Sequence, residues 1–226
     1  MQYPNICAAV FMARLNRFVA QVLLDGQIVP VHVKNTGRCR ELLVPGARVW
    51  LTRSGNPARK TAYDLVAAEK EGRLVNMDAQ APNKVFGEWA AEGRFVPGLT
   101  RLQAERTHGD SRFDFYWESG PRRGFVEVKG VTLERDGAVY FPDAPTERGV
   151  KHLRGLTACL REGYEAAVCF VAQMNGVTFF SPNDETHPAF GAALREAAAA
   201  GVKVLALDCL TEPDRLTLHE PVEVRL

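Results

Sequence analysis

The pattern of predicted secondary structure changes near residues 81–83, and this change constrains the fold more than any other feature. Before it, apolar or β-branched runs at residues 18–24, 28–33, 48–52, 63–68 and 74–77 are separated by short turns. Asp25-Gly26, between the first two runs, is a strong hairpin signal. Short strands joined in this way are typical of a small barrel or sandwich. We also expect a short helix at residues 37–43, closed by Pro45-Gly46.

Helices and strands are mixed in the second part of the chain. Asn83 is a good helix N-cap, and residues 84–92 are expected to form a helix that ends at Gly93. Thr146 can cap a second helix, which carries an apolar stripe between residues 150 and 160. The other expected elements are strands at 112–118, 124–133, 139–141, 168–172, 177–180 and 202–207 and a helix at 188–200. This order favours a mixed sheet with helices on its faces, in the α/β (α+β) class, and domains at residues 1–82 and 83–226.

Charge is unevenly distributed along a chain that is nearly neutral as a whole. The 226 residues carry 28 Lys and Arg against 27 Asp and Glu, and 46% are hydrophobic, which excludes a disordered chain. Residues 34–60 hold seven Lys or Arg and a single acid, Glu41. This local excess on a small β-domain favours a nucleic-acid surface, with an ordinary solvated surface as the alternative. In this stretch we expect phosphate contacts from Lys34, Arg38 and Arg40.

The most informative motif is a predicted hairpin at residues 111–133. If its turn centres on Gly120-Pro121, the numbers of paired residues sum to 241, and Asp114 falls directly opposite Glu127. Lys129 follows on the same face as Glu127. The same alternation places three aromatic residues together on one face of the first strand: Phe113, Phe115 and Trp117. Directly opposed like charges destabilise a hairpin, so the two carboxylates need a compensating group.

A divalent cation is such a group. Mg²⁺ takes hard oxygen ligands, commonly one or two carboxylates with waters. Lys129, beside the carboxylates, can hold a water or a phosphate oxygen, and this combination suits hydrolysis of a phosphodiester. The alternative is an exposed strand face without function, because the spacing also occurs by chance and a slip of one residue would turn these side chains to the other face.

Several cations and one histidine outside this motif are further candidates. Arg148 and Lys151 lie three residues apart on the helix at 146–161 and share a side, where they can contact phosphate or form a solvated basic face. Arg112, on the strand of Asp114, is another candidate for phosphate binding. His152 is either a proton carrier or a partner in a structural hydrogen bond.

Other chemistries and locations are not supported. The five Cys residues form no CxxC pair, which argues against zinc and thioredoxin-type sites and for free thiols in a cytoplasmic protein. Walker A, GxGxxG, HExxH and GxSxG sequences are absent, so we expect no nucleotide cofactor. The longest uncharged run, 166–183, has polar residues at its middle and reads as two strands around a turn, so no membrane association is expected.

The hairpin residues Asp114 and Glu127-Val128-Lys129 resemble the core of PD-(D/E)xK nucleases, although Phe113 stands where that motif has proline. Four segments resemble the sugar fermentation stimulation protein family: HVKNTGRCRELLVPG, SRFDFYW, FVEVKGVTL and FPDAPTERGVKHLRGL. The resemblance implies an N-terminal OB-like barrel and a C-terminal restriction-endonuclease-like domain. It also implies non-specific DNA binding and a regulatory role in maltose metabolism.

The resemblance gives the hairpin residues definite roles. Asp114 and Glu127 would bind Mg²⁺ or Mn²⁺, with the Val128 carbonyl as a third ligand and Glu88 completing the shell, and Lys129 would position the water. The expected partner is DNA or RNA, held through its phosphate backbone. The alternative is a non-catalytic DNA-binding regulator of sugar metabolism that keeps the nuclease fold. A third hypothesis, a sugar-binding protein, is supported only by the name of the family. The sequence leaves open whether the partner is DNA or RNA, whether the protein cleaves or only binds it, and what the oligomeric state is.

Overall fold

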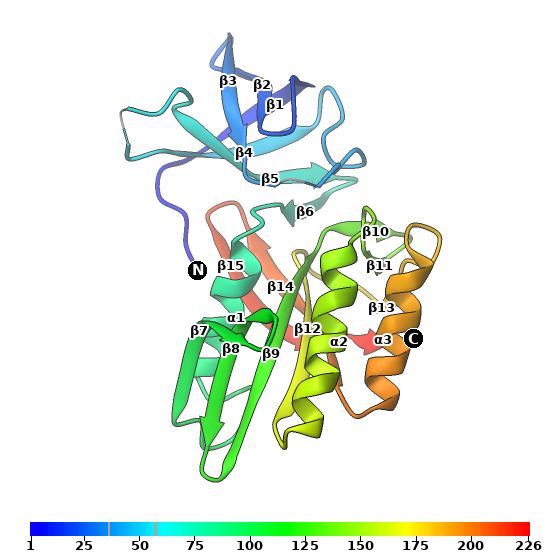
Figure 1. Cartoon of the computed structure of the whole chain (residues 1–226). Coiled ribbons are helices and arrows are strands. Elements are labelled where there is room, and N and C mark those ends of the chain that lie inside the picture. Colours follow the sequence, from blue (N-terminus) through cyan, green and yellow to red (C-terminus); the bar gives the residue numbers. More distant parts are fainter. Residues whose placement is uncertain (36, 57) are drawn as a thin grey trace.

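The computed structural model describes residues 1–35, 37–56 and 58–226. Figure 1 shows a small N-terminal barrel, in blue and cyan, next to a larger domain in which helices cover an extended sheet. The first residues of the chain leave the barrel and reach the larger domain, where Gln2 forms an isolated antiparallel bridge with Arg215.

Five strands close the N-terminal barrel. They are β1 (Ile6–Arg14), β2 (Val19–Leu24), β3 (Gln27–Val33), β4 (Arg48–Arg53) and β5 (Tyr63–Lys70). Their order is β3-β2-β1-β4-β5, and the parallel pairing of β3 with β5 closes the ring. This connectivity is that of an OB-fold, so the expected barrel is confirmed. A short strand, β6 (Arg73–Asn76), pairs with β5 and leads toward the second domain.

The helix expected at residues 37–43 was wrong. The backbone N–H groups of Leu42 and Leu43 both reach the carbonyl of Cys39, which forms a turn. Cys39 takes a φ of 43°, in the left-handed region that a right-handed helix cannot contain. Pro45-Gly46 then leads into β4, as the turn signal predicted.

The second domain is built on a six-stranded mixed sheet. Its strands are β7 (Arg101–His108), β8 (Ser111–Ser119), β9 (Arg122–Val131), β12 (Glu165–Ala172), β14 (Lys203–Glu212) and β15 (Arg215–Pro221), in the order β15-β14-β12-β9-β8-β7. The central strands β9, β12 and β14 are parallel. A smaller sheet contains β10 (Leu133–Arg135), β11 (Ala138–Phe141), β13 (Phe179–Pro182) and β16 (Glu223–Val224). The mixed sheet predicted from the sequence is therefore confirmed.

Three helices in the described residues cover the two faces of this sheet: α1 (Ala81–Ala91), α2 (Glu147–Arg161) and α3 (Pro188–Ala199). In β12, Cys169 packs in the cluster that contains α1, and Phe170 packs in the cluster that contains α2 and α3. Burial on both faces explains why β12 is continuously apolar. The expected cap of α2 is confirmed, because the Thr146 hydroxyl accepts the N–H of Gly149 at 3.1 Å. Helix α1 begins earlier than expected, with Gln80 as N-cap and Pro82 in its first turn.

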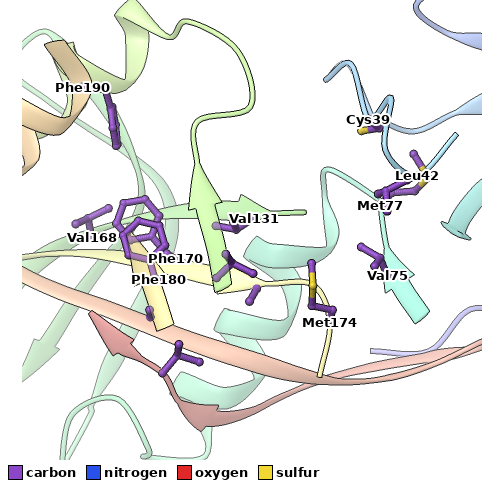
Figure 2. Packing of buried hydrophobic residues seen from close by; sticks show 14 of the residues in the cluster. Cys39, Leu42, Val75, Met77, Val131, Val168, Phe170, Met174, Phe180 and Phe190 are labelled. Carbon is purple, nitrogen blue, oxygen red and sulfur yellow. The ribbon is translucent and has the colours of Figure 1, made fainter. Parts of the chain in front are cut away.

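The two domains share one apolar core. Figure 2 shows Cys39, Leu42, Val75 and Met77 from the N-terminal part on one side, Phe170, Phe180 and Phe190 on the other, and Met174 between them. A buried polar network lies at the same junction. Asp78 accepts hydrogen bonds from the Lys34 ammonium at 2.6 Å and the Tyr3 hydroxyl at 3.2 Å, and the Gln173 amide donates to the carbonyl of Asp78 at 3.0 Å.

All five cysteines are free thiols, and four of them are buried. In residues 1–35, 37–56 and 58–226, no helix has the length and apolar character needed to cross a membrane.

Candidate metal centre and nucleic-acid surface

The register of the β8–β9 hairpin brings the predicted carboxylates together. Trp117 pairs with Gly124 and Phe115 with Val126, which is the register inferred from the turn. Beyond Phe115 the backbone ladder stops, and the Asp114 side chain takes its place: Oδ2 accepts the backbone N–H of Val128 at 2.8 Å. The Asn83 amide, in the first turn of α1, donates to Oδ1 of Asp114 at 2.8 Å.

The side-chain alternation of β8 breaks at Asp114. Phe115 and Trp117 pack on the α1 side, as expected, but Phe113 packs on the α2 side, with its ring centroid 5.2 Å from that of Phe125. The prediction that the three aromatic residues share a face was therefore wrong for Phe113. On the neighbouring strand, Glu105 is left out of the pairing with β8 and has a φ of 55°. This irregularity frees Asp114 to turn toward β9 instead of into either apolar face.

The two oxygens of the Glu127 carboxylate have different surroundings. Glu127 is only 2% exposed and faces α2. Its Oε1 accepts hydrogen bonds from the Lys129 ammonium, at 2.5 Å, and from Nδ1 of His152. Its Oε2 is buried without a hydrogen-bond partner in the described part of the chain. A buried anionic oxygen without a partner is costly, and a bound cation would remove that cost.

The pKa values of the two carboxyls shift in opposite directions. Burial, and next the negative charge of Glu127, raise the pKa of Asp114 against the opposing hydrogen bond from Val128. Burial also opposes ionisation of Glu127, but the hydrogen bonds from His152 and Lys129 outweigh it and lower its pKa. The pair is thus a charged carboxylate next to one whose charge is unfavourable until a cation compensates it.

The donors around these carboxylates fit a hard cation. In a β-strand the N–H and C=O of one residue point toward the same neighbour, so the Val128 carbonyl faces the Asp114 side of β9. Among the described residues there is no group of three or more His, Cys, Asp or Glu side chains suited to a metal. Two carboxylates and a backbone oxygen, with waters, fit Mg²⁺ or Mn²⁺ but not a structural zinc site.

Glu88 does not join this group, which corrects the expectation that it completes the metal shell. Its carboxylate forms an ion pair with the Met1 amine at 2.7 Å and is 47% exposed. It lies five residues after Asn83, the residue of α1 that touches Asp114. Five residues rotate a helical side chain by about 140° and move it by about 7.5 Å, which directs Glu88 away from Asp114.

The candidate phosphate-binding cations divide into paired and exposed residues. Lys34 is paired with the buried Asp78 at 2.6 Å, so its charge is compensated inside the protein and we remove it from the set. Arg59, in the same basic stretch, is likewise held by Asp64 at 2.6 Å. The candidates that remain exposed are Arg38, Arg40, Arg112, Arg148 and Lys151. Arg112 has a long contact of 3.7 Å with Glu105, and both are well exposed.

Two residues of the site had no firm place in the sequence reading. The sequence predicts Asn83 only as a helix cap, and its contact with Asp114 depends on α1 starting at Ala81. The sequence allows His152 to be either a proton carrier or a partner in a structural hydrogen bond, and in the structure it contacts Glu127 directly. Its place one turn after Arg148 on a capped helix was the available signal, but only the packing of α2 on β9 brings the ring to Glu127.

Comparison with known proteins gives matches over nearly the whole chain. Residues 12–77 match the model of the SfsA N-terminal OB domain, and residues 80–215 match that of the sugar fermentation stimulation protein RE domain. The sugar fermentation stimulation protein homolog of Desulfitobacterium hafniense (strain Y51) is 53% identical, with 100% of this chain and 99% of the relative covered. That of Clostridium beijerinckii is 49% identical, with both chains fully covered. The structure of Pyrococcus furiosus SfsA in complex with Ca²⁺ superposes with a TM-score of 0.91, at 27% identity, over 100% of this chain and 98% of that one.

Proposed function

The chain belongs to the sugar fermentation stimulation protein family, and from this premise we propose that it binds nucleic acid non-specifically and carries a divalent-metal-dependent phosphodiesterase site. The observation that carries the proposal is the buried Oε2 of Glu127, which has no hydrogen-bond partner in the described residues, in a carboxylate close enough to Asp114 for its charge to raise the pKa of Asp114. A related protein's structure is named as a complex with Ca²⁺, another cation that prefers oxygen ligands, which supports a cation site in this fold.

The residues of the site have separable roles in this proposal. Asp114, Glu127 and the Val128 carbonyl hold Mg²⁺ or Mn²⁺, and Asn83 keeps Asp114 turned toward Val128. A metal bound here supplies a water of lowered pKa and stabilises negative charge on phosphate. Lys129 is fixed beside Glu127, where its ammonium can orient a water or a phosphate oxygen. His152 and Lys129 keep Glu127 ionised, so the carboxylate is ready for a cation.

Nucleic acid would be held through its phosphates. Arg148 and Lys151 are exposed on α2, the helix whose His152 contacts Glu127, and the barrel adds the exposed Arg38 and Arg40. Contacts between cationic side chains and phosphates carry no sequence information, so binding through these residues should be non-specific. If these four and Arg112 each neutralise one phosphate of a duplex, log K falls with log salt with a slope of about −4.5.

The test joins metal binding and cleavage in one set of variants. Calorimetry with Mn²⁺ should show a site in the wild-type protein that Asp114→Ala and Glu127→Ala abolish, and the same substitutions should abolish Mn²⁺-dependent cleavage of single- or double-stranded DNA or RNA. Asp110→Ala, in the exposed β7–β8 turn, is the matched control. Cleavage that survives both site substitutions would refute the assignment. DNA binding without a metal site or cleavage would identify the protein as the non-catalytic regulator instead.

A further inference from the structure

Two side chains, Arg148 and His152, connect the exposed surface of α2 to the buried carboxylate of Glu127. Arg148 is exposed, and its Nε donates to Nε2 of His152 at a long 3.4 Å. His152 is 5% exposed, and its Nδ1 contacts Oε1 of Glu127. Since an arginine can only donate, Nε2 of His152 is the acceptor and Nδ1 carries the proton that Glu127 receives as a hydrogen bond. The arginine and the carboxylate together thus select one tautomer of His152.

We propose that His152 is a positioning residue that fixes Glu127 with Oε2 free for a divalent cation, and that Arg148 links this arrangement to a phosphate of bound nucleic acid. This inference rests on the proposed function and adds to it a coupling between the two kinds of ligand.

The packing of α2 explains why His152 is suited to this role. A Cβ on Gly155 would lie 2.8 Å from the hydroxyl of Ser111 and 3.1 Å from the ring of Phe113, so the absence of a side chain lets α2 lie directly on β8. The His152 ring also lies edge-on to Phe113, with centroids 6.2 Å apart. Lys129, the other donor to Oε1, has a flexible four-carbon stem and is less able to fix an orientation.

This packing explains why the two carboxylate oxygens of Glu127 have different surroundings. Two donors occupy Oε1 and leave Oε2 without a partner in the described residues, and the Glu127 charge is close enough to Asp114 to raise its pKa. Outer hydrogen-bond partners of metal ligands typically contribute about 10- to 100-fold to metal affinity. His152 occupies this position toward Glu127.

The contact between Arg148 and His152 predicts that phosphate binding and cation binding are coupled. A phosphate bound to the Arg148 guanidinium acts on a side chain that also contacts His152. Lys151, about one helical turn further along α2, is also exposed and could bind phosphate, but it has no such contact with His152 among the described residues. Coupling between two binding sites is reciprocal, so a bound cation should raise nucleic-acid affinity by the factor by which nucleic acid raises cation affinity.

The first experiment measures Mn²⁺ affinity by calorimetry without nucleic acid. His152→Ala should weaken Mn²⁺ binding by about 10- to 100-fold. His152→Asn should largely restore it, since its amide nitrogen takes the place of Nδ1, and His152→Gln, whose amide lies nearer the position of Nε2, should not. Arg161→Ala removes a charge from the far end of α2 as a control and should leave the affinity unchanged.

The outcomes separate this inference from the proposed function. A wild-type protein without an Asp114-dependent Mn²⁺ site refutes the proposed function. A wild-type site that His152→Ala leaves at full affinity, or that Asn and Gln at position 152 restore equally, refutes the positioning role while the function stands. The Asn and Gln variants keep the comparison valid if the Ala variant does not fold.

The second experiment tests the link through Arg148. Binding of a labelled DNA duplex is measured by fluorescence anisotropy with Ca²⁺ and with EDTA. Arg148→Ala should lower both the affinity and the ratio between the two conditions, whereas Lys151→Ala should lower the affinity and keep the wild-type ratio. Equal ratios in the two variants would refute the coupling.

Discussion

Replacing Asp114 by Asn should stabilise the metal-free protein, although it removes a proposed metal ligand. Asp114 and Glu127 are both carboxylates in a largely buried setting, and the charge of Glu127 raises the pKa of Asp114, second only to burial. An Asn side chain keeps the local hydrogen bonds: its carbonyl accepts the N–H of Val128, and its amide donates to Asn83 once that amide is turned. The substitution therefore removes the repulsion and leaves both Asn83 and the Val128 N–H paired.

The magnitude is an estimate that takes the spacing of a regular opposed pair for the two carboxylates. Opposed residues in a hairpin have Cβ atoms about 5 Å apart, and two unit charges at about that distance repel by about 3 kcal/mol at an effective dielectric constant of about 20. Converting two hydrogen bonds from a charged to a neutral acceptor loses about 1 kcal/mol each. The net gain is about 1 kcal/mol, which raises Tm by about 2–4 °C in a chain of this size.

Thermal unfolding followed by circular dichroism in EDTA and in Mn²⁺ checks this prediction. In EDTA, Asp114→Asn should melt above the wild type. In Mn²⁺ the order should reverse, because a ligand at 100 times its Kd stabilises the wild type by about 2.7 kcal/mol and the variant binds it poorly. Asp110→Asn, in the exposed turn before β8, should change neither melt. A lower melt for Asp114→Asn in EDTA, or equal stabilisation by Mn²⁺, would show that the carboxylates do not repel each other or do not bind the metal.

Three further substitutions test the packing, the electrostatics and the helix capping of the fold. Burial opposes ionisation of Glu134, but a hydrogen bond from Lys70 at 2.8 Å outweighs burial and lowers the pKa of Glu134. This pair therefore stabilises the protein above about pH 4.5, and its contribution is lost as the pH falls through the lowered pKa. Glu134→Gln should cost about 1–3 kcal/mol near neutral pH and flatten the acid limb of urea-unfolding free energy against pH; an unchanged limb would contradict this. Gly124→Ala should cost about 3 kcal/mol in the same urea assay, because its Cβ would lie 2.3 Å from the Glu165 carbonyl oxygen of β12, and a cost near zero would mean that the strands can separate. Thr146→Ala should lose about 1 kcal/mol as the α2 cap disappears, while Thr146→Ser keeps it, so equal losses would exclude capping as the cause.

The sequence was sufficient for features that depend on local pattern. The centre of the turn at Gly120-Pro121 gave the register of β8 and β9, because pairing in a hairpin follows from where its turn lies. The cap and apolar stripe of α2 were readable for the same reason. What the alternation could not show is the break at Asp114, since it depends on a left-handed residue, Glu105, on a neighbouring strand.

Contacts between distant segments were beyond any local pattern. His152 reaches Glu127 because α2 lies closely on β8, and Asn83 reaches Asp114 because α1 starts early enough to present its first turn to the sheet. Glu88 is the converse case: an acid on the right helix that points elsewhere and pairs with the Met1 amine. Helix identity was predictable, but the face presented to the site depends on where the helix begins.

In the barrel, counting the Lys and Arg residues between residues 34 and 60 overstates the number of cations that are available to bind phosphate. Two of the seven cations between residues 34 and 60 are neutralised by acids outside that window, Lys34 by Asp78 and Arg59 by Asp64. In the proposed function, the exposed cations of the barrel act together with those on α2. Domains that share a large apolar interface do not move independently, and the core here is continuous from Met77 to Met174 and beyond. Nucleic acid that contacts both domains meets cations at fixed separations, so removing charge from either domain should weaken binding by more than its share of the phosphate contacts.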